Sequence, residues 1–218
     1  MTTTIPVLDM SRYSLDVVSQ EVDTQTIRSL AESLCGAFRD VGFCYITNHG
    51  FKQSLIDRTM EVACTFFEMP VEYKNMYRRP SDAFYGWIPQ GTESLNQVNR
   101  FDYKEAYNYP PVDGTELIPD VKDYKVTMEE FRASCYTLGH RLFDLMSVGM
   151  ALEDRDFLRK CHTLLGKKGN TSGLRSIYYP PLPPNKDIKP NQVRCGEHSD
   201  YGSLTLLFQD DAGGLEVV

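Results

Sequence analysis

Two residues near the end of the sequence, His198 and Asp200, have the types and the spacing of metal ligands. On a β-strand, residues i and i+2 point to the same face, so the imidazole and the carboxylate would lie side by side, roughly 6–7 Å apart at the backbone. A mixed nitrogen and oxygen donor set suits Fe(II), Mn(II) or Zn(II), and two histidines with one carboxylate suit an Fe(II) oxygenase. A hydrogen-bonded histidine beside a solvated aspartate gives the same pattern, so the surrounding elements must decide.

The residues after Gly173 have the pattern of a sheet that could position this pair. The stretch "LRSIYY" is rich in β-branched and aromatic residues and predicts a strand. A proline-rich connection, "PPLPPNKDIKP", follows it. Turn residues then separate three further strand candidates, which are "QVRCGEHSD", "SLTLLFQ" and "LEVV". His198 and Asp200 therefore lie on one predicted strand of a β-region.

The residues before Gly173 are mainly helical in pattern. Apolar residues recur at three- and four-residue steps from Ile27 to Val41, which predicts an amphipathic helix. Asp23 or Thr24 can cap its start. Related patterns predict the remaining elements of this region, which are strands at Ile5–Met10, Phe43–His49 and within "FDYKEAYNY", a helix from Leu55 to near Pro70, a long helix opened by a capping box at Thr127–Glu130, and a helix at Phe157–Leu165. Helices followed by strands suggest helices packed on a sheet or barrel.

The composition is that of an ordinary globular protein of 218 residues, of which 41% are hydrophobic and 24% charged. The formal net charge of −7 disfavours nucleic acid as a partner, because phosphate binding needs clustered Lys and Arg. Six cysteines without a CxxC spacing indicate a reducing compartment. The N-terminus lacks the pattern of a secretory signal, and no apolar run approaches the ~20 residues of a membrane span. We therefore expect a cytoplasmic protein that binds neither nucleic acid nor membranes.

Ordered motifs cover essentially the whole chain. They are "IPVLDM", "GFCYITNHG", "FFEMPVEYKNMY", "YGWIPQGTESLN", "DYKEAYNY", "LRSIYYPP" and "GEHSDYGSLTLLFQDDAGGLEVV". Their order resembles the iron(II)- and 2-oxoglutarate-dependent dioxygenases, in the branch that includes isopenicillin N synthase-like enzymes. The resemblance implies an α+β fold in which an N-terminal helical region packs on a double-stranded β-helix, or jelly-roll. Residues 1–124 would form the N-terminal dioxygenase region, and residues 125–218 a long helix and the first part of the jelly-roll domain.

The same resemblance assigns roles to three residues. His198 and Asp200 take the place of the first two iron ligands, and Tyr179 takes that of a tyrosine that hydrogen-bonds the 2-oxoglutarate carboxylate. A half-buried strand tyrosine is an equally good reading of Tyr179. The implied cofactors are Fe(II), 2-oxoglutarate and O2, and the implied substrate is a small organic molecule. The other histidines, which are His49, His140 and His162, are expected to be structural or at the surface.

In the family, a second iron-binding histidine and an Arg-x-Ser that grips 2-oxoglutarate come later than the H-x-D pair. The sequence ends at Val218, before either, so we expect these 218 residues to be truncated and to lack the third ligand. Three hypotheses follow. The chain is part of an active dioxygenase, or it is a short, non-catalytic binding or regulatory module, or it is part of an iron oxidase that does not use 2-oxoglutarate.

Overall fold

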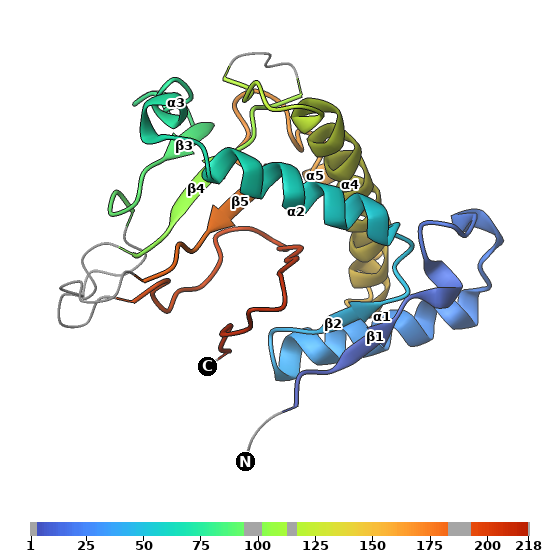
Figure 1. The fold of residues 1–218 in the computed structure, drawn as a ribbon. Coiled ribbons are helices and arrows are strands. Elements are labelled where there is room, and N and C mark those ends of the chain that lie inside the picture. The colour runs from blue at the N-terminus through green and yellow to red at the C-terminus, as the bar shows by residue number, and fades with distance from the viewer. Residues whose placement is uncertain (1–3, 94–101, 113–116, 183–192, 218) are drawn as a thin grey trace. The chain divides into compact units, whose positions relative to one another are not determined.

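The computed structural model describes residues 4–93, 102–112, 117–182 and 193–217, and the chain divides into two compact units (Figure 1). Unit 1 comprises residues 1–56 and 130–163, and unit 2 comprises residues 57–129 and 164–218. Two long helices contribute residues to both units, namely α2 (Gln53–Phe67) and α4 (Tyr124–Gly149). The division predicted between residues 124 and 125 stays a prediction.

Unit 1 contains a two-stranded parallel sheet beside helix α1 (Figure 1). Strand β1 (Val7–Asp9) pairs with β2 (Tyr45–Thr47). Helix α1 (Thr24–Asp40) begins where the sequence predicts, because Asp23 Oδ1 accepts a hydrogen bond from the Thr26 amide at 2.9 Å. The other elements of this unit are two 3₁₀ turns and a short helix, which are Ser11–Tyr13, Ser19–Glu21 and α5 (Phe157–Cys161).

Helices α1 and α4 approach closely at Gly149. A Cβ atom on Gly149 would lie 2.7 Å from the carbonyl oxygen of Ala31 and closer still to the thiol of Cys35. Real side chains essentially never come that close, so glycine is required at the point where the end of α4 meets α1. Ala31 and Leu34 of α1 have no exposed surface.

The loop after β1 is fixed to α4 by a polar network inside unit 1. The Arg141 guanidinium donates to the carbonyl oxygens of Tyr13 at 3.0 Å and Val17 at 2.7 Å, and it lies over the Tyr13 ring. The Tyr13 hydroxyl donates to Asp144 Oδ2 at 3.2 Å, and Arg159 donates to both oxygens of the same carboxylate. Burial, reinforced by the negative charge of Asp144, raises the pKa of Tyr13 to about 12.

Unit 2 is built on a three-stranded antiparallel sheet in the order β3-β4-β5 (Figure 1). The strands are β3 (Gly86–Ile88), β4 (Glu105–Asn108) and β5 (Arg175–Tyr178). Trp87 faces Tyr107 across the first pair of strands. The core of the unit is an aromatic cluster that joins the sheet to α2 and to the start of α4, and its buried members are Val62, Phe66, Phe67, Trp87, Tyr107, Tyr109, Tyr124 and Met128.

A buried ion pair, Lys74 with Glu105, contacts this cluster at Trp87. Lys74, in the short helix α3 (Val71–Asn75), donates to Glu105 Oε1 at 2.9 Å and Oε2 at 2.8 Å, and also to the Phe67 carbonyl at 2.8 Å. Trp87 Nε1 donates to Glu105 Oε2 at 2.6 Å. The Lys74 and Glu105 side chains are only 7% and 10% exposed. The pair is therefore both desolvated and well hydrogen-bonded.

The prediction of further strands near the end of the sequence was wrong for this structure. No strand forms among residues 193–217, although "SLTLLFQ" has strand composition; Asn191, Gln192 and Val218 lie outside the described residues. Strands need a ladder of backbone hydrogen bonds to a neighbour. Tyr103 N donates to Val193 O at 3.0 Å, but within the described segments no such ladder continues from there.

Helix boundaries differ from the prediction at two places, and two elements were missed. Helix α4 starts at Tyr124 rather than at the predicted capping box, so Thr127 lies inside the helix and its amide donates to the Asp123 carbonyl at 3.0 Å. Helix α5 ends at Cys161 instead of continuing to Leu165. The missed elements, α3 and β3, lie where short segments carry too little periodicity to predict.

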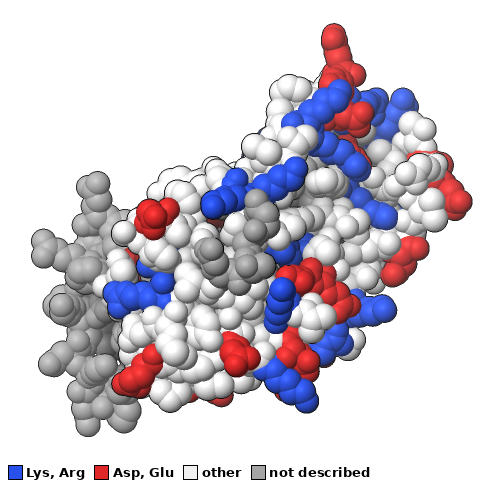
Figure 2. All heavy atoms as spheres, turned by 90° about the horizontal axis from the view of Figure 1, so that it is seen from above, with Lys and Arg blue, Asp and Glu red and all other residues white. Residues whose placement is uncertain are grey.

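The distribution of charged side chains and the composition of the helices were compared with what nucleic-acid and membrane partners require. On the face drawn in Figure 2, Lys and Arg side chains are interspersed with Asp and Glu side chains. Among the described residues, no helix is both long enough and apolar enough to cross a membrane.

Candidate metal and cosubstrate site

His198 and Asp200 face each other in unit 2, as their spacing predicts. His198 Nε2 lies 3.4 Å from Asp200 Oδ1, and the side chains are 36% and 52% exposed. The segment that carries them is not paired in a sheet. The imidazole and the carboxylate thus lie close together, although they are not on a paired strand.

His198 Nδ1 and Asp200 Oδ2, the two polar atoms outside the His198–Asp200 contact, each lie within hydrogen-bond distance of another group. His198 Nδ1 lies 2.8 Å from the Gly196 carbonyl oxygen. A carbonyl can only accept, so Nδ1 carries a proton, and Nε2 is the ring nitrogen directed toward Asp200. Thr205 Oγ1 donates to Asp200 Oδ2 at 2.5 Å. Such outer contacts are typical of metal ligands, because they fix the histidine tautomer and orient the carboxylate.

The pair fits two neighbouring positions on one metal ion. Nitrogen and oxygen donors bind first-row metal ions at about 2.0–2.2 Å, so two donors at a right angle lie about 3 Å apart. The observed 3.4 Å is close to that separation. Among the described residues, no cluster of three or more His, Cys, Asp or Glu side chains could hold a metal ion.

Tyr179 lies directly after β5 and is 41% exposed. Partial burial, together with the adjacent Cys195 thiol and the Asp102 carboxylate, raises the pKa of Tyr179 to about 12. The hydroxyl is therefore a neutral donor at physiological pH. The contacts of the described residues join Tyr179 to Cys195 and do not join it to His198 or Asp200.

Sequence reasoning missed a buried polar group beside Tyr179. The Lys104 ammonium, with a side chain only 3% exposed, lies 2.9 Å from Asp102 Oδ2 and donates to Cys195 Sγ at 3.5 Å. The Asp102 side chain has no exposed surface, and its Oδ1 lacks a hydrogen-bond partner in the part of the chain that is described. The signal was the i, i+2 spacing of Asp102 and Lys104 at the start of "DYKEAYNY", where alternation places both on one face.

The remaining histidines make contacts of a structural kind within unit 1. His49 Nδ1 accepts a hydrogen bond from the Phe51 amide at 3.1 Å. The His162 ring stacks on Phe143 with centroids 4.2 Å apart. Burial lowers the pKa of His140, a residue of α4.

The chain matches proteins of one family. Residues 5–138 match the family described as "non-haem dioxygenase in morphine synthesis N-terminal". The proline hydroxylase buaE of Petromyces alliaceus is 32% identical over 202 residues, which are 87% of this chain and 61% of that protein. The 2-oxoglutarate-dependent dioxygenase htyE of Aspergillus rugulosus is 32% identical over 206 residues, which are 84% of this chain and 59% of that protein.

This chain also resembles solved structures of oxygenases. A full-length protein of Neurospora crassa, solved in complex with alpha-KG and thymine, superposes with a TM-score of 0.73 at 25% identity, covering 91% of this chain and 62% of that protein. The chain thus spans about 60% of the length of the proteins that it matches. These structures confirm the predicted fold class, in which helices pack on a jelly-roll. The match to the family over residues 5–138, more than half of the 218 residues, shows that the chain belongs to the non-haem iron(II)- and 2-oxoglutarate-dependent dioxygenases.

Proposed function

We propose that this chain carries part of the catalytic site of an enzyme that oxidises a small organic molecule with O2 and 2-oxoglutarate, releasing succinate and CO2. In this proposal His198 and Asp200 are two protein ligands of Fe(II), and Tyr179 binds 2-oxoglutarate. The observation that carries it is the 3.4 Å approach of His198 Nε2 to Asp200 Oδ1, with the outer atom of each side chain held by its own hydrogen bond. Membership of the dioxygenase family supports the same assignment.

His198, Thr205 and Tyr179 have different roles in the proposed site. When bound, the iron supplies the chemistry of oxygen activation, which side chains alone lack. The Gly196 carbonyl holds a proton on Nδ1 of His198, so Nε2 is the nitrogen that would bind the metal. Thr205 keeps the Asp200 carboxylate turned toward the imidazole. Tyr179, whose pKa is raised to about 12, is a neutral donor at physiological pH and donates its hydroxyl hydrogen to a carboxylate of 2-oxoglutarate.

The substrate class and the compartment belong to the same proposal. The relatives include a proline hydroxylase and a protein solved with bound thymine, and both names point to small polar molecules. We extend that class to this chain. All six cysteines are free, which supports a reducing compartment such as the cytoplasm.

The test is the release of succinate and the uptake of O2 by the purified chain with Fe(II), with and without 2-oxoglutarate. Turnover needs a further metal ligand besides His198 and Asp200; where it is supplied, we expect O2-dependent succinate release that is lost in His198→Ala and retained in His140→Gln, a control histidine of α4. Oxygen uptake that ignores 2-oxoglutarate would instead identify an iron oxidase. The absence of both reactions and of metal binding would indicate a non-catalytic module, provided that circular dichroism shows the chain to be folded.

A further inference from the structure

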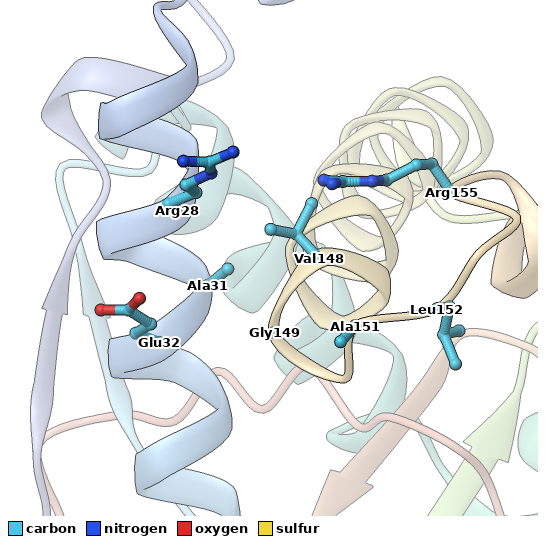
Figure 3. A pocket seen from close by; sticks show the side chains of 8 residues that line it. All are labelled: Arg28, Ala31, Glu32, Val148, Gly149, Ala151, Leu152 and Arg155. Atoms are coloured by element: carbon cyan, nitrogen blue, oxygen red, sulfur yellow. The ribbon is translucent and has the colours of Figure 1, made fainter.

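Unit 1 contains a pocket of about 340 Å³ beside the close approach of α1 and α4. Arg28, Ala31 and Glu32 of α1 form one wall, and residues from Val148 to Arg155, at and beyond the end of α4, form the other (Figure 3). The size lies at the lower end of the range for small-molecule sites. Gly149 creates the space for this crossing, because no larger residue fits there.

Two guanidinium groups converge over this pocket. Figure 3 shows the Arg28 and Arg155 side chains pointing toward each other above Val148, while Glu32 points away from Arg155. Neither arginine makes an ion pair within the described segments, whereas the nearby Arg159 is paired with Asp144. The chain as a whole is acidic, with a net charge of −7, whereas this pocket has two cations without an ion-pair partner among the described residues.

We infer that this pocket binds a small organic dianion, with one carboxylate on each guanidinium. Planar guanidinium groups match carboxylates with two parallel hydrogen bonds, and two such groups on opposite walls favour two carboxylates joined by a short carbon chain. Ala31, Val148 and Leu152 provide apolar surface for that chain. The residues that line the pocket include neither His198 nor Asp200.

The carbonyl groups at the C-terminal end of α4 repel a bound anion only weakly. The C-terminus of a helix carries partial negative charge on its free carbonyls. Here the Ser147 carbonyl accepts a hydrogen bond from the Leu152 amide at 3.0 Å, and the Val148 carbonyl accepts one from the Ala151 amide at 3.0 Å. Ala151 adopts a positive φ of 54°, so the helix ends in a Schellman turn that occupies these carbonyls. The charged side chains of the lining are therefore two positive ones, Arg28 and Arg155, and one negative one, Glu32.

The experiment is a titration of the metal-free His198→Ala chain with succinate, followed by ¹H–¹⁵N NMR of the backbone amides. The His198→Ala background removes the candidate metal site, so the outcome is independent of the proposed enzymatic function. We expect saturable shifts confined to α1 and the end of α4, with weaker binding of acetate. Replacing both Arg28 and Arg155 by Gln should weaken binding about tenfold or more, since charge-assisted hydrogen bonds are lost.

Two further variants keep the result interpretable. Arg39→Gln removes a cation from the same helix outside the pocket, where the side chain is 74% exposed, and should leave affinity unchanged. Glu32→Gln removes the pocket's own negative charge and should tighten binding by about twofold or more, a gain that misfolding cannot mimic. Failure of the chain to give saturable shifts, equal weakening by Arg39→Gln, or unchanged affinity in the double variant would overturn the inference.

Discussion

Replacement of Lys74 by Met should destabilise unit 2 severely. The change removes the ammonium that donates to both oxygens of Glu105 and to the Phe67 carbonyl. The Glu105 carboxylate would then be buried with Trp87 Nε1 as its remaining donor from this network. Breaking one partner of a buried ion pair costs about 3–5 kcal/mol, because the other charge is left uncompensated. A typical domain has only about 5–15 kcal/mol of stability in total.

The measurement is the free energy of unfolding from urea titrations followed by Trp87 fluorescence, since Trp87 is the chain's single tryptophan and touches the pair. Glu105→Leu should cost a similar amount, because it leaves the Lys74 ammonium buried. The double variant Lys74→Met/Glu105→Leu should cost less than the sum by about 2 kcal/mol or more, since no buried charge remains. A double variant whose cost equals the sum of the single costs would refute the reasoning that the two charges compensate each other.

Three other perturbations test separate parts of the structure. Gly149→Ala should destabilise by about 1–3 kcal/mol in thermal unfolding because its Cβ has no room, whereas Gly139→Ala in the same helix, with open space around it, should be neutral or stabilising; equal effects would contradict the close approach. Because folding raises the pKa of Tyr13 from about 10 to about 12, its stabilising contribution is complete below pH 10 and is lost as the pH rises to 12. Wild type should therefore lose about 1 kcal/mol more than Tyr13→Phe between pH 8 and pH 11, and parallel curves would exclude this linkage. Thr205→Val should weaken Mn(II) binding about tenfold or more by releasing the Asp200 carboxylate, and an unchanged dissociation constant would remove Thr205 from the site.

The sequence predicted the long helices and most of the early strands because their signals are local. The apolar spacing after Asp23 and the capping preference of that residue both act within one helix, and both are seen in α1. The capping box at Thr127 was misleading for the same reason. Thr127 is buried in a helix that already begins at Tyr124, where the aromatic core holds the chain. Tertiary packing thus overrode a local preference.

The candidate site was predictable only in part. The approach of His198 to Asp200 was expected from their i, i+2 spacing alone, so two residues were sufficient to predict it. The group formed by Lys104, Asp102 and Cys195 depends on a contact between segments that are 91 residues apart, which no local pattern encodes. The predicted strands after residue 193 failed for the related reason that a strand exists only with a paired neighbour.

Anaerobic binding of Mn(II), a redox-inert substitute for Fe(II), tests the His198–Asp200 site most directly when it is measured by electron paramagnetic resonance with and without 2-oxoglutarate. We predict binding that 2-oxoglutarate strengthens, that His198→Ala and Asp200→Asn each weaken at least about tenfold, and that His140→Gln leaves unchanged. Equal affinity in the wild-type chain and the His198→Ala variant, at either 2-oxoglutarate concentration, would contradict the assignment of His198 and Asp200 as metal ligands.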